Sequence, residues 1–264
     1  MLENFRAAAL EASVTALALP RKSAACYDLC AAMPATIREN ILRIQDRIAK
    51  ARQKSPYPAE VTLIAVSKTH PPESIREAYQ AGLRHFGENR VQEWEGKRPQ
   101  LEDLPATWHL IGHLQSNKSG RAANAFHSVD SVDDFALAQR LDHAREELNI
   151  KEKLRILVEV RVENETTKTG AEFHTVPQLL EKLAQLKNLE VAGLMCIPPF
   201  LEDPQKVRPY FTRLRKLRDH LATSSTLPLP VLSMGMSHDF EIAIQEGSTE
   251  VRIGTAIFGT RPNP

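Results

Sequence analysis

The chain has few cysteines, no long apolar run and almost no net charge. Its 264 residues include three cysteines, Cys26, Cys30 and Cys196. This small, odd number with no metal-type pairing excludes a disulfide framework and indicates a reducing, cytoplasmic compartment. No uncharged apolar run reaches the length of about 18 residues that a membrane span requires, so we predict none. A formal net charge of +1 provides no basic surface for nucleic acid.

The first 34 residues differ in character from the rest. Their apolar stretch is interrupted by Glu11, and Glu3 lies where a secretory signal needs only positive charge. We therefore predict a poorly ordered N-terminal extension over 1–34 and a single domain over 35–264. Met33 is an alternative start, in which case the upstream residues are a gene-model artefact or a targeting segment.

From residue 36 onward, short apolar runs alternate with amphipathic stretches. Strict alternation of strand and helix predicts parallel strands with right-handed crossovers. Eight such units in the length available fit an α/β fold, the closed (β/α)8 TIM barrel. A doubly wound open sheet is the alternative, but its usual glycine-rich turn is missing after Val66. The strands are predicted at 62–66, 84–87, 108–112, 127–132, 155–162, 190–195, 231–234 and 250–253.

Three helix starts carry side-chain signals. Thr36 and Glu39 have capping-box spacing, Thr175 precedes a leucine-rich helix, and Ser237 follows the seventh strand. Each of these hydroxyls is expected to cap its helix. A further helix is predicted from Asn89.

Lys68 closes the first buried strand. Open α/β sheets and α/β barrels keep their chemistry at the carboxyl ends of the strands. Burial lowers the pKa of an amine, so a lysine placed there can become a nucleophile toward a carbonyl. A solvated lysine that merely closes a strand is the alternative.

The last two strands end in residues suited to an anion. Gly235 and Ser237 follow the seventh strand, and Gly254 and Thr255 follow the eighth, where α/β barrels usually bind phosphate. In the simpler interpretation, Ser237 only caps a helix and Gly254 only allows a turn. Arg252 is permanently charged and offers only donors, so opposite a pyridine nitrogen it would keep that nitrogen unprotonated. An ion pair with a carboxylate of the barrel is the alternative.

Two histidines and one loop also lie near the ends of predicted strands. His109 and His113 are four residues apart near the third strand, but no nearby acid completes a metal site, and we predict none. The loop 163–170 after the fifth strand is expected to be solvated or to act as a lid.

These blocks together resemble the pyridoxal phosphate homeostasis protein family, in order, from about residue 36 to the end. The resemblance implies a barrel similar to the N-terminal domain of alanine racemase. It further implies pyridoxal 5′-phosphate (PLP) as a Schiff base on Lys68, a phosphate held by Ser237, Gly254 and Thr255, Arg252 facing the pyridine nitrogen, and Asn89 beside the cofactor. The blocks that carry it are 65–69, 85–93, 108–118, 168–170, 193–195, 233–237 and 247–259.

Three features depart from the family pattern. Residues 1–34 lie outside it, His70 stands where many members have lysine, and Arg161 stands where many have asparagine. Because of these two substitutions, the resemblance does not predict the contacts at the entrance to the cofactor site. The predicted Schiff base on Lys68 is not affected.

The resemblance implies a protein of intracellular vitamin B6 homeostasis, without catalytic residues or substantial catalysis. The alternative is a PLP-dependent amino-acid racemase. Racemisation needs the ring as an electron sink and an acid/base group on each face, but Arg252 would weaken the sink. In racemases the opposite base comes from a second domain, and this sequence ends at Pro264. A lysine Schiff-base aldolase or sugar-phosphate barrel would explain Lys68 but not Arg252. PLP-dependent apo-enzymes are the expected recipients, and we expect a monomer.

Overall fold

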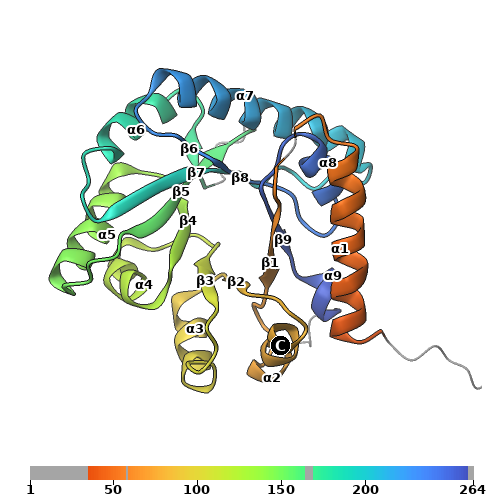
Figure 1. Ribbon diagram of the computed structural model, residues 1–264. Coiled ribbons are helices and arrows are strands. Elements are labelled where there is room, and N and C mark those ends of the chain that lie inside the picture. The colour runs from red at the N-terminus through yellow and green to blue at the C-terminus, as the bar shows by residue number, and fades with distance from the viewer. Residues whose placement is uncertain (1–34, 58, 164–168, 261–264) are drawn as a thin grey trace, which may run out of the picture. The chain divides into compact units, whose positions relative to one another are not determined.

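The computed structural model describes residues 35–57, 59–163 and 169–260. Eight parallel strands form a closed barrel surrounded by helices (Figure 1). Around the ring the order is β1, β2, β3, β4, β5, β7, β8, β9, and β9 pairs with β1. The predicted barrel is therefore confirmed. Its strands are β1 (Thr62–Val66), β2 (His85–Glu88), β3 (Thr107–Leu110), β4 (Ser128–Val132), β5 (Leu154–Arg161), β7 (Leu189–Met195), β8 (Val231–Ser233) and β9 (Glu250–Ile253).

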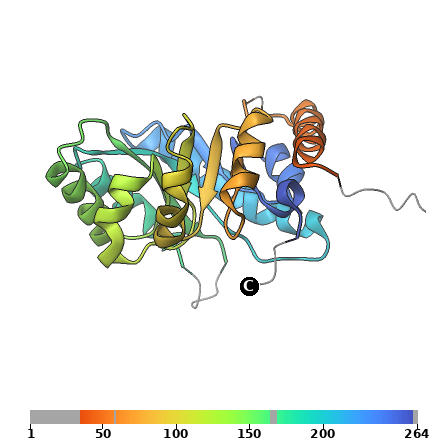
Figure 2. The ribbon, with the colours of Figure 1, turned by 90° about the horizontal axis from the view of Figure 1, so that it is seen from below.

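Helices cover the outside of the ring in chain order. They are α1 (Ile37–Gln53), α2 (Pro72–Gln80), α3 (Val91–Lys97), α4 (Ser119–Ala125), α5 (Phe135–Glu147), α6 (Val176–Leu183), α7 (Arg208–Ser224), α8 (Phe240–Gln245) and α9 (Thr255–Phe258). Short 3-10 turns occupy Arg98–Gln100, Ser116–Lys118 and Pro204–Val207, and a two-residue strand β6 (Ala171–Glu172) pairs with the end of β5. Figures 1 and 2 both show α1 beside α8 and α9. Among the described helices, none combines the length and apolar character needed to cross a bilayer.

The main hydrophobic core lies between the strands and the helices. Residues that point outward from the barrel pack there, among them Ala65, Phe86, Leu110 and Val129, all buried. Alternate residues point into the barrel, where a small separate apolar cluster contains Leu157, Ala192 and Met195. The apolar runs of the sequence predicted these strands because the outward-facing positions must be buried under helices.

The amino-terminal half of the barrel interior is filled by charged and polar side chains. His85 Nδ1 lies 3.1 Å from His109 Nε2, and His109 Nδ1 lies 3.1 Å from Asp130 Oδ2. Arg155 crosses the interior and donates to Glu250 Oε1 at 2.6 Å. Because this cluster occupies the space at the amino ends of the strands, any ligand inside the barrel is confined to the carboxyl ends.

The helix starts agree only in part with the sequence. Thr36 and Glu39 form the predicted reciprocal capping box. The hydroxyl of Thr175 instead donates to the carbonyl of Glu172 and caps nothing, and α8 begins at Phe240, three residues after Ser237. Both capping predictions were wrong because the chain makes a turn before each helix. The prediction for residues 1–34 and most of the predicted 163–170 loop lie outside the described residues.

Candidate functional site

Lys68 lies in a tight turn directly after β1. The amide of His70 donates to the carbonyl of Ser67 at 3.1 Å, so Lys68 and Thr69 are the two central residues of the turn. Thr69 has φ 65°, and Lys68 is not among the residues with positive φ. This is the signature of a type II turn, in which glycine normally occupies the position of Thr69. Lys68 itself is half-buried at the carboxyl end of the barrel.

Arg252 lies in the barrel wall on the neighbouring strand β9. Its guanidinium donates to Ser233 Oγ at 2.7 Å and to the carbonyl of Cys196 at 2.8 Å, and the residue is 3% exposed. Within the part of the chain that the structure describes, no carboxylate forms an ion pair with it. Both of these hydrogen-bond partners are neutral groups. A buried cation held at two points keeps its remaining donors available to a ligand.

The loop after β8 is joined to the neighbouring strand β9. The amide of Arg252 donates to the carbonyl of Gly235 at 3.0 Å. Gly235 has φ 96°, and a Cβ atom there would lie 2.6 Å from Cβ of Ala243, so a side chain is excluded. The loop after β8 is therefore held in a fixed arrangement beside β9 and α8.

Backbone amides in the loops after β8 and β9 are available for an anion. Among the described residues, no acceptor receives a hydrogen bond from the amides of Ser237, His238, Gly254, Thr255 or Ala256. Instead, the carboxylate of Asp239 accepts from the Met236 amide at 2.7 Å. Clusters of unpaired N–H groups with a nearby hydroxyl bind phosphate and carboxylate groups.

Asn89 follows β2 and is half-buried. A Cβ atom on Gly112 would lie 2.4 Å from the carbonyl oxygen of Asn89, so the loop after β3 packs directly on this residue. Beside Asn89 lies a cavity of about 760 Å³, whose lining includes Arg90, His113 and Lys118. The helix predicted from Asn89 begins two residues later, at Val91.

The two histidines near the third strand have separate partners. His109 belongs to the buried interior cluster with His85 and Asp130, whereas Nδ1 of the exposed His113 lies 4.0 Å from Asp133 Oδ2. In the described ranges no group of three or more histidine, cysteine or acidic side chains is arranged to hold a metal ion.

The two positions that depart from the family pattern have local partners. His70 is buried and its ring stacks on Phe258, with 4.8 Å between the centroids. Arg161 donates to the carbonyl of Gly170 at 3.1 Å.

Sequence reasoning missed two buried acids at the carboxyl end of the barrel. Glu159 of β5 accepts a hydrogen bond from Thr169 at 3.1 Å, and burial raises the pKa of its carboxyl. Glu88, the last residue of β2, is fully buried and bonded to Ser67 and Lys97. A charged residue at the end of a buried strand was the available signal for both.

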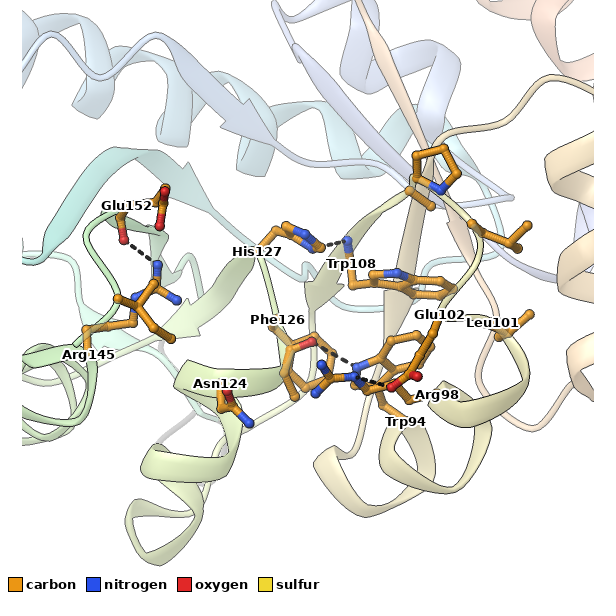
Figure 3. Close-up of a pocket in the computed structure, with 15 residues that line it drawn as sticks. Trp94, Arg98, Leu101, Glu102, Trp108, Asn124, Phe126, His127, Arg145 and Glu152 are labelled. Atoms are coloured by element: carbon orange, nitrogen blue, oxygen red, sulfur yellow. Dashed lines mark hydrogen bonds and ion pairs between the residues drawn. The ribbon is translucent and has the colours of Figure 1, made fainter. Parts of the chain in front are cut away.

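Another cavity, of about 570 Å³, lies at the amino ends of β3 and β4. Figure 3 shows Trp94 stacked on Trp108, with His127 beside them and Arg145 at the far end. Both tryptophans are almost completely buried, so their ring faces are not available for stacking on a ligand. This cavity is at the opposite end of the strands from Lys68.

The predicted site residues converge on one part of the ring. They lie in or directly after four strands, β2, β1, β9 and β8, which are consecutive neighbours in the barrel. An amine, a buried guanidinium and two loops with unpaired amides thus meet at the carboxyl ends of adjacent strands. That combination fits a phosphorylated aldehyde with a ring nitrogen, since each polar part of such a molecule finds a matching group. The residues are Lys68, Asn89, Ser237, Arg252, Gly254 and Thr255.

Known proteins match this chain in sequence along most of its length. Residues 39–262 match the family model of the alanine racemase N-terminal domain. A pyridoxal phosphate homeostasis protein of Aquifex aeolicus is 46% identical over 224 residues, which cover 84% of this chain and 97% of that protein. One from Escherichia coli K12 is 38% identical over 231 residues, covering 85% and 97%.

The chain belongs to the pyridoxal phosphate homeostasis protein family. Solved structures agree with this family membership. PipY of Synechococcus elongatus, solved with PLP bound, superposes with a TM-score of 0.76 at 39% identity, covering 85% of this chain and all of that one. An alanine racemase of Clostridium difficile superposes with a TM-score of 0.63 at 12% identity, covering 86% of this chain and 56% of that one. The racemase likeness shows a shared barrel fold only.

Proposed function

We propose that this chain binds pyridoxal 5′-phosphate as a Schiff base on Lys68 and serves intracellular PLP homeostasis without substantial catalysis. The observation that carries the proposal is the meeting of Lys68, Arg252 and the two amide-bearing loops at the ends of three consecutive strands, β1, β9 and β8. The names of the relatives, which this chain matches along nearly their whole length, support it.

Each polar part of the cofactor has a proposed partner. The amine of Lys68 would form an imine with the aldehyde carbon, the aldehyde oxygen leaving as water with the two amine protons, and Asn89 would lie beside the ring. Ser237, Gly254 and Thr255 supply backbone amides and hydroxyls to the phosphate. Arg252 donates to the ring nitrogen.

Arg252 also accounts for the expected lack of turnover. When bound, the cofactor supplies an electron sink whose strength depends on a protonated ring nitrogen. A guanidinium cannot give up its proton in a protein, so it donates a hydrogen bond and leaves the nitrogen unprotonated. Ser233 and Cys196 hold the guanidinium in place, so this side of the site favours retention of the cofactor over reaction.

The first experiment locates the covalent bond. Purified protein mixed with PLP should be yellow, should bleach with borohydride, and should yield a pyridoxyl-modified peptide containing Lys68 on mass spectrometry. Lys68→Ala should remain colourless, while Lys50→Ala on the exposed face of α1 should behave like the wild type. A modified peptide elsewhere, or no adduct at all, would overturn the assignment.

The second experiment tests the phosphate-binding loops. The double variant Ser237→Ala, Thr255→Ala should bind PLP at least about tenfold more weakly, since hydrogen bonds to charged groups contribute about 1.5–3 kcal/mol each. Thr223→Ala with Ser224→Ala is a matched control, because those hydroxyls donate to the carbonyl of His220 at the end of α7. Equal affinity in the two double variants would remove the phosphate assignment.

Turnover, assembly and location complete the proposal. The racemase alternative predicts interconversion of alanine enantiomers, whereas we expect none above the rate of free PLP. We further propose a cytoplasmic monomer that supplies PLP-dependent apo-enzymes. Activation of an apo-enzyme by the loaded protein faster than by the PLP it releases would support direct transfer, and sedimentation would report the oligomeric state.

A further inference from the structure

The turn that carries Lys68 has an unfavourable backbone. Thr69 adopts φ 65°, a region that β-branched residues rarely occupy because the side chain crowds the backbone. The turn's own hydrogen bond, from the His70 amide to the Ser67 carbonyl, spans 3.1 Å. Without further contacts, Thr69 would relax to negative φ and the Lys68 peptide group would rotate.

Side chains of β2 and α3 bind this turn on both sides of Lys68. Lys97 Nζ donates to the carbonyl of Ser67 at 2.9 Å, and Ser67 Oγ donates to Glu88 Oε1 at 2.7 Å. On the other side, the amide of Thr69 donates to Glu93 Oε1. The residues before and after Lys68 are therefore both fixed by groups from outside the turn.

One ammonium group joins the two sides. Lys97 Nζ lies 2.9 Å from Glu88 Oε1 and 2.7 Å from Glu93 Oε1, and its side chain is only 10% exposed. Burial raises the pKa of Glu88, which Lys97 and Ser67 partly offset. Burial also acts to raise the pKa of Glu93, but the hydrogen bonds from Lys97 and Thr69 outweigh it and lower that pKa.

A buried ion pair of this kind has a high desolvation cost and contributes little to stability compared with apolar packing. Its geometric effect is specific, because its hydrogen bonds to the β1 turn reach the two neighbours of Lys68 in the chain. Ser67 is bonded by Lys97 and Glu88, and Thr69 is bonded by Glu93. The ion pair therefore fixes the backbone on either side of the amine-bearing residue.

We propose that Glu93, Lys97 and Glu88 are positioning residues that hold the strained turn and thereby orient the Lys68 amine for bonding to an aldehyde. The inference rests on the proposed function in that Lys68 is taken as the bonding residue. The three residues act through Ser67 and Thr69 and do not themselves bond to the aldehyde.

The decisive comparison uses two glutamates on the same helix. Glu93→Ala removes the acceptor of the Thr69 amide, and Glu95→Ala removes a partner of Arg121 on the surface of the same helix. Their side chains are similarly exposed, at 25% and 32%. Both variants should fold, and each loses one ion pair.

Two readouts separate orientation from general stability. Hydrogen exchange of the peptide that contains Thr69, measured without PLP, should be about tenfold faster in Glu93→Ala than in Glu95→Ala. The second-order rate of Schiff-base formation, followed by absorbance after PLP is added, should fall about tenfold in Glu93→Ala and should be unchanged in Glu95→Ala. Lys97→Met should show both changes more strongly.

Equal exchange and equal bonding rates in the two alanine variants would overturn the proposal, even if Lys97→Met failed to fold. A lower melting temperature in Glu93→Ala with both readouts unchanged would also overturn it, since that is a purely structural role. If the wild type formed no bond at Lys68, the proposed function would fail, whereas the exchange comparison would still decide whether Glu93 holds the turn.

Discussion

At the scale of single residues, the guanidinium of Arg252 combines burial with a fixed orientation. Arg252→Lys keeps the charge but can reach only one of the two partners, Ser233 Oγ and the Cys196 carbonyl. We expect the free energy of unfolding to fall by about 1–3 kcal/mol and PLP affinity to decrease. Urea denaturation measures the first and an absorbance titration the second. Arg140→Lys, at an exposed position on α5, should change neither, and a variant at 252 as stable as this control would contradict the expectation.

A second residue-scale prediction concerns His85 in the amino half of the barrel. Burial, His109 and Arg155 lower the pKa of His85 to about 4. Between pH 6.5 and 4 the unfolded chain then binds a proton that the folded protein does not, so stability falls as the pH falls through this window.

The matching experiment is urea denaturation from about pH 7 to about pH 4. His85→Gln should flatten the pH dependence by about 1–2 kcal/mol, allowing for the partial exposure of the ring. Some slope should remain, because burial also lowers the pKa of His127. His143→Gln, at an exposed position on α5, serves as the control. If the dependence of stability on pH were the same in His85→Gln as in the wild type, His85 would not resist protonation in the folded protein.

At the scale of elements, helix caps differ in strength although they share a residue type. Thr36 Oγ1 accepts from the Glu39 amide at 3.2 Å, whereas the hydroxyl of Thr175 returns to the carbonyl of Glu172. Thr36→Ala should therefore cost about 1 kcal/mol of stability, and Thr175→Ala less than about 0.5 kcal/mol. Chemical denaturation of both variants provides the test. Equal losses would mean that the cap of α1 adds nothing beyond propensity.

The same contrast shows how far the sequence determines the elements. Strands such as β1 and β5 were predictable because long apolar and β-branched runs have few other uses in a soluble chain. The starts of α6 and α8 were not, because whether Thr175 or Ser237 caps a helix depends on the turn before it. The predicted site residues lie in or directly after strands, so they could be proposed from short stretches of sequence. Lys97 and Glu93 could not, since their partners Ser67 and Thr69 lie 30 and 24 residues away in the chain.

At the scale of the whole molecule, closure of the ring depends on a close approach of β7 and β8. A Cβ atom on Gly193 would lie 2.0 Å from the carbonyl oxygen of Val231, a backbone atom in the neighbouring strand. Gly193→Ala should lower the free energy of unfolding by about 3 kcal/mol or more, because the two strands must separate.

Gly96 provides the matched control for this prediction. It lies on α3, and a Cβ atom added there would have open space around it, so Gly96→Ala should be neutral or stabilising by up to about 1 kcal/mol. Thermal and urea unfolding of both variants measure the difference. A Gly193→Ala variant as stable as Gly96→Ala would show that the barrel adjusts its strand spacing at little cost.

The largest-scale prediction concerns the first 34 residues. The first turn of α1 is completed by its own residues, because Thr36 and Glu39 bond each other's backbone amides. A chain that begins at residue 35 should therefore melt within about 3 °C of the full chain and bind the same amount of PLP. A chain that begins at residue 41 loses the capping box and the 3.0 Å bond from Asn40 to the Ile257 carbonyl, about 2 kcal/mol in all. It should melt about 4–8 °C lower. Calorimetry of the full chain and the two shortened chains measures their melting temperatures. If removing residues 1–34 alone lowered the melting temperature by about 4 °C or more, that segment would contribute to the stability of the barrel.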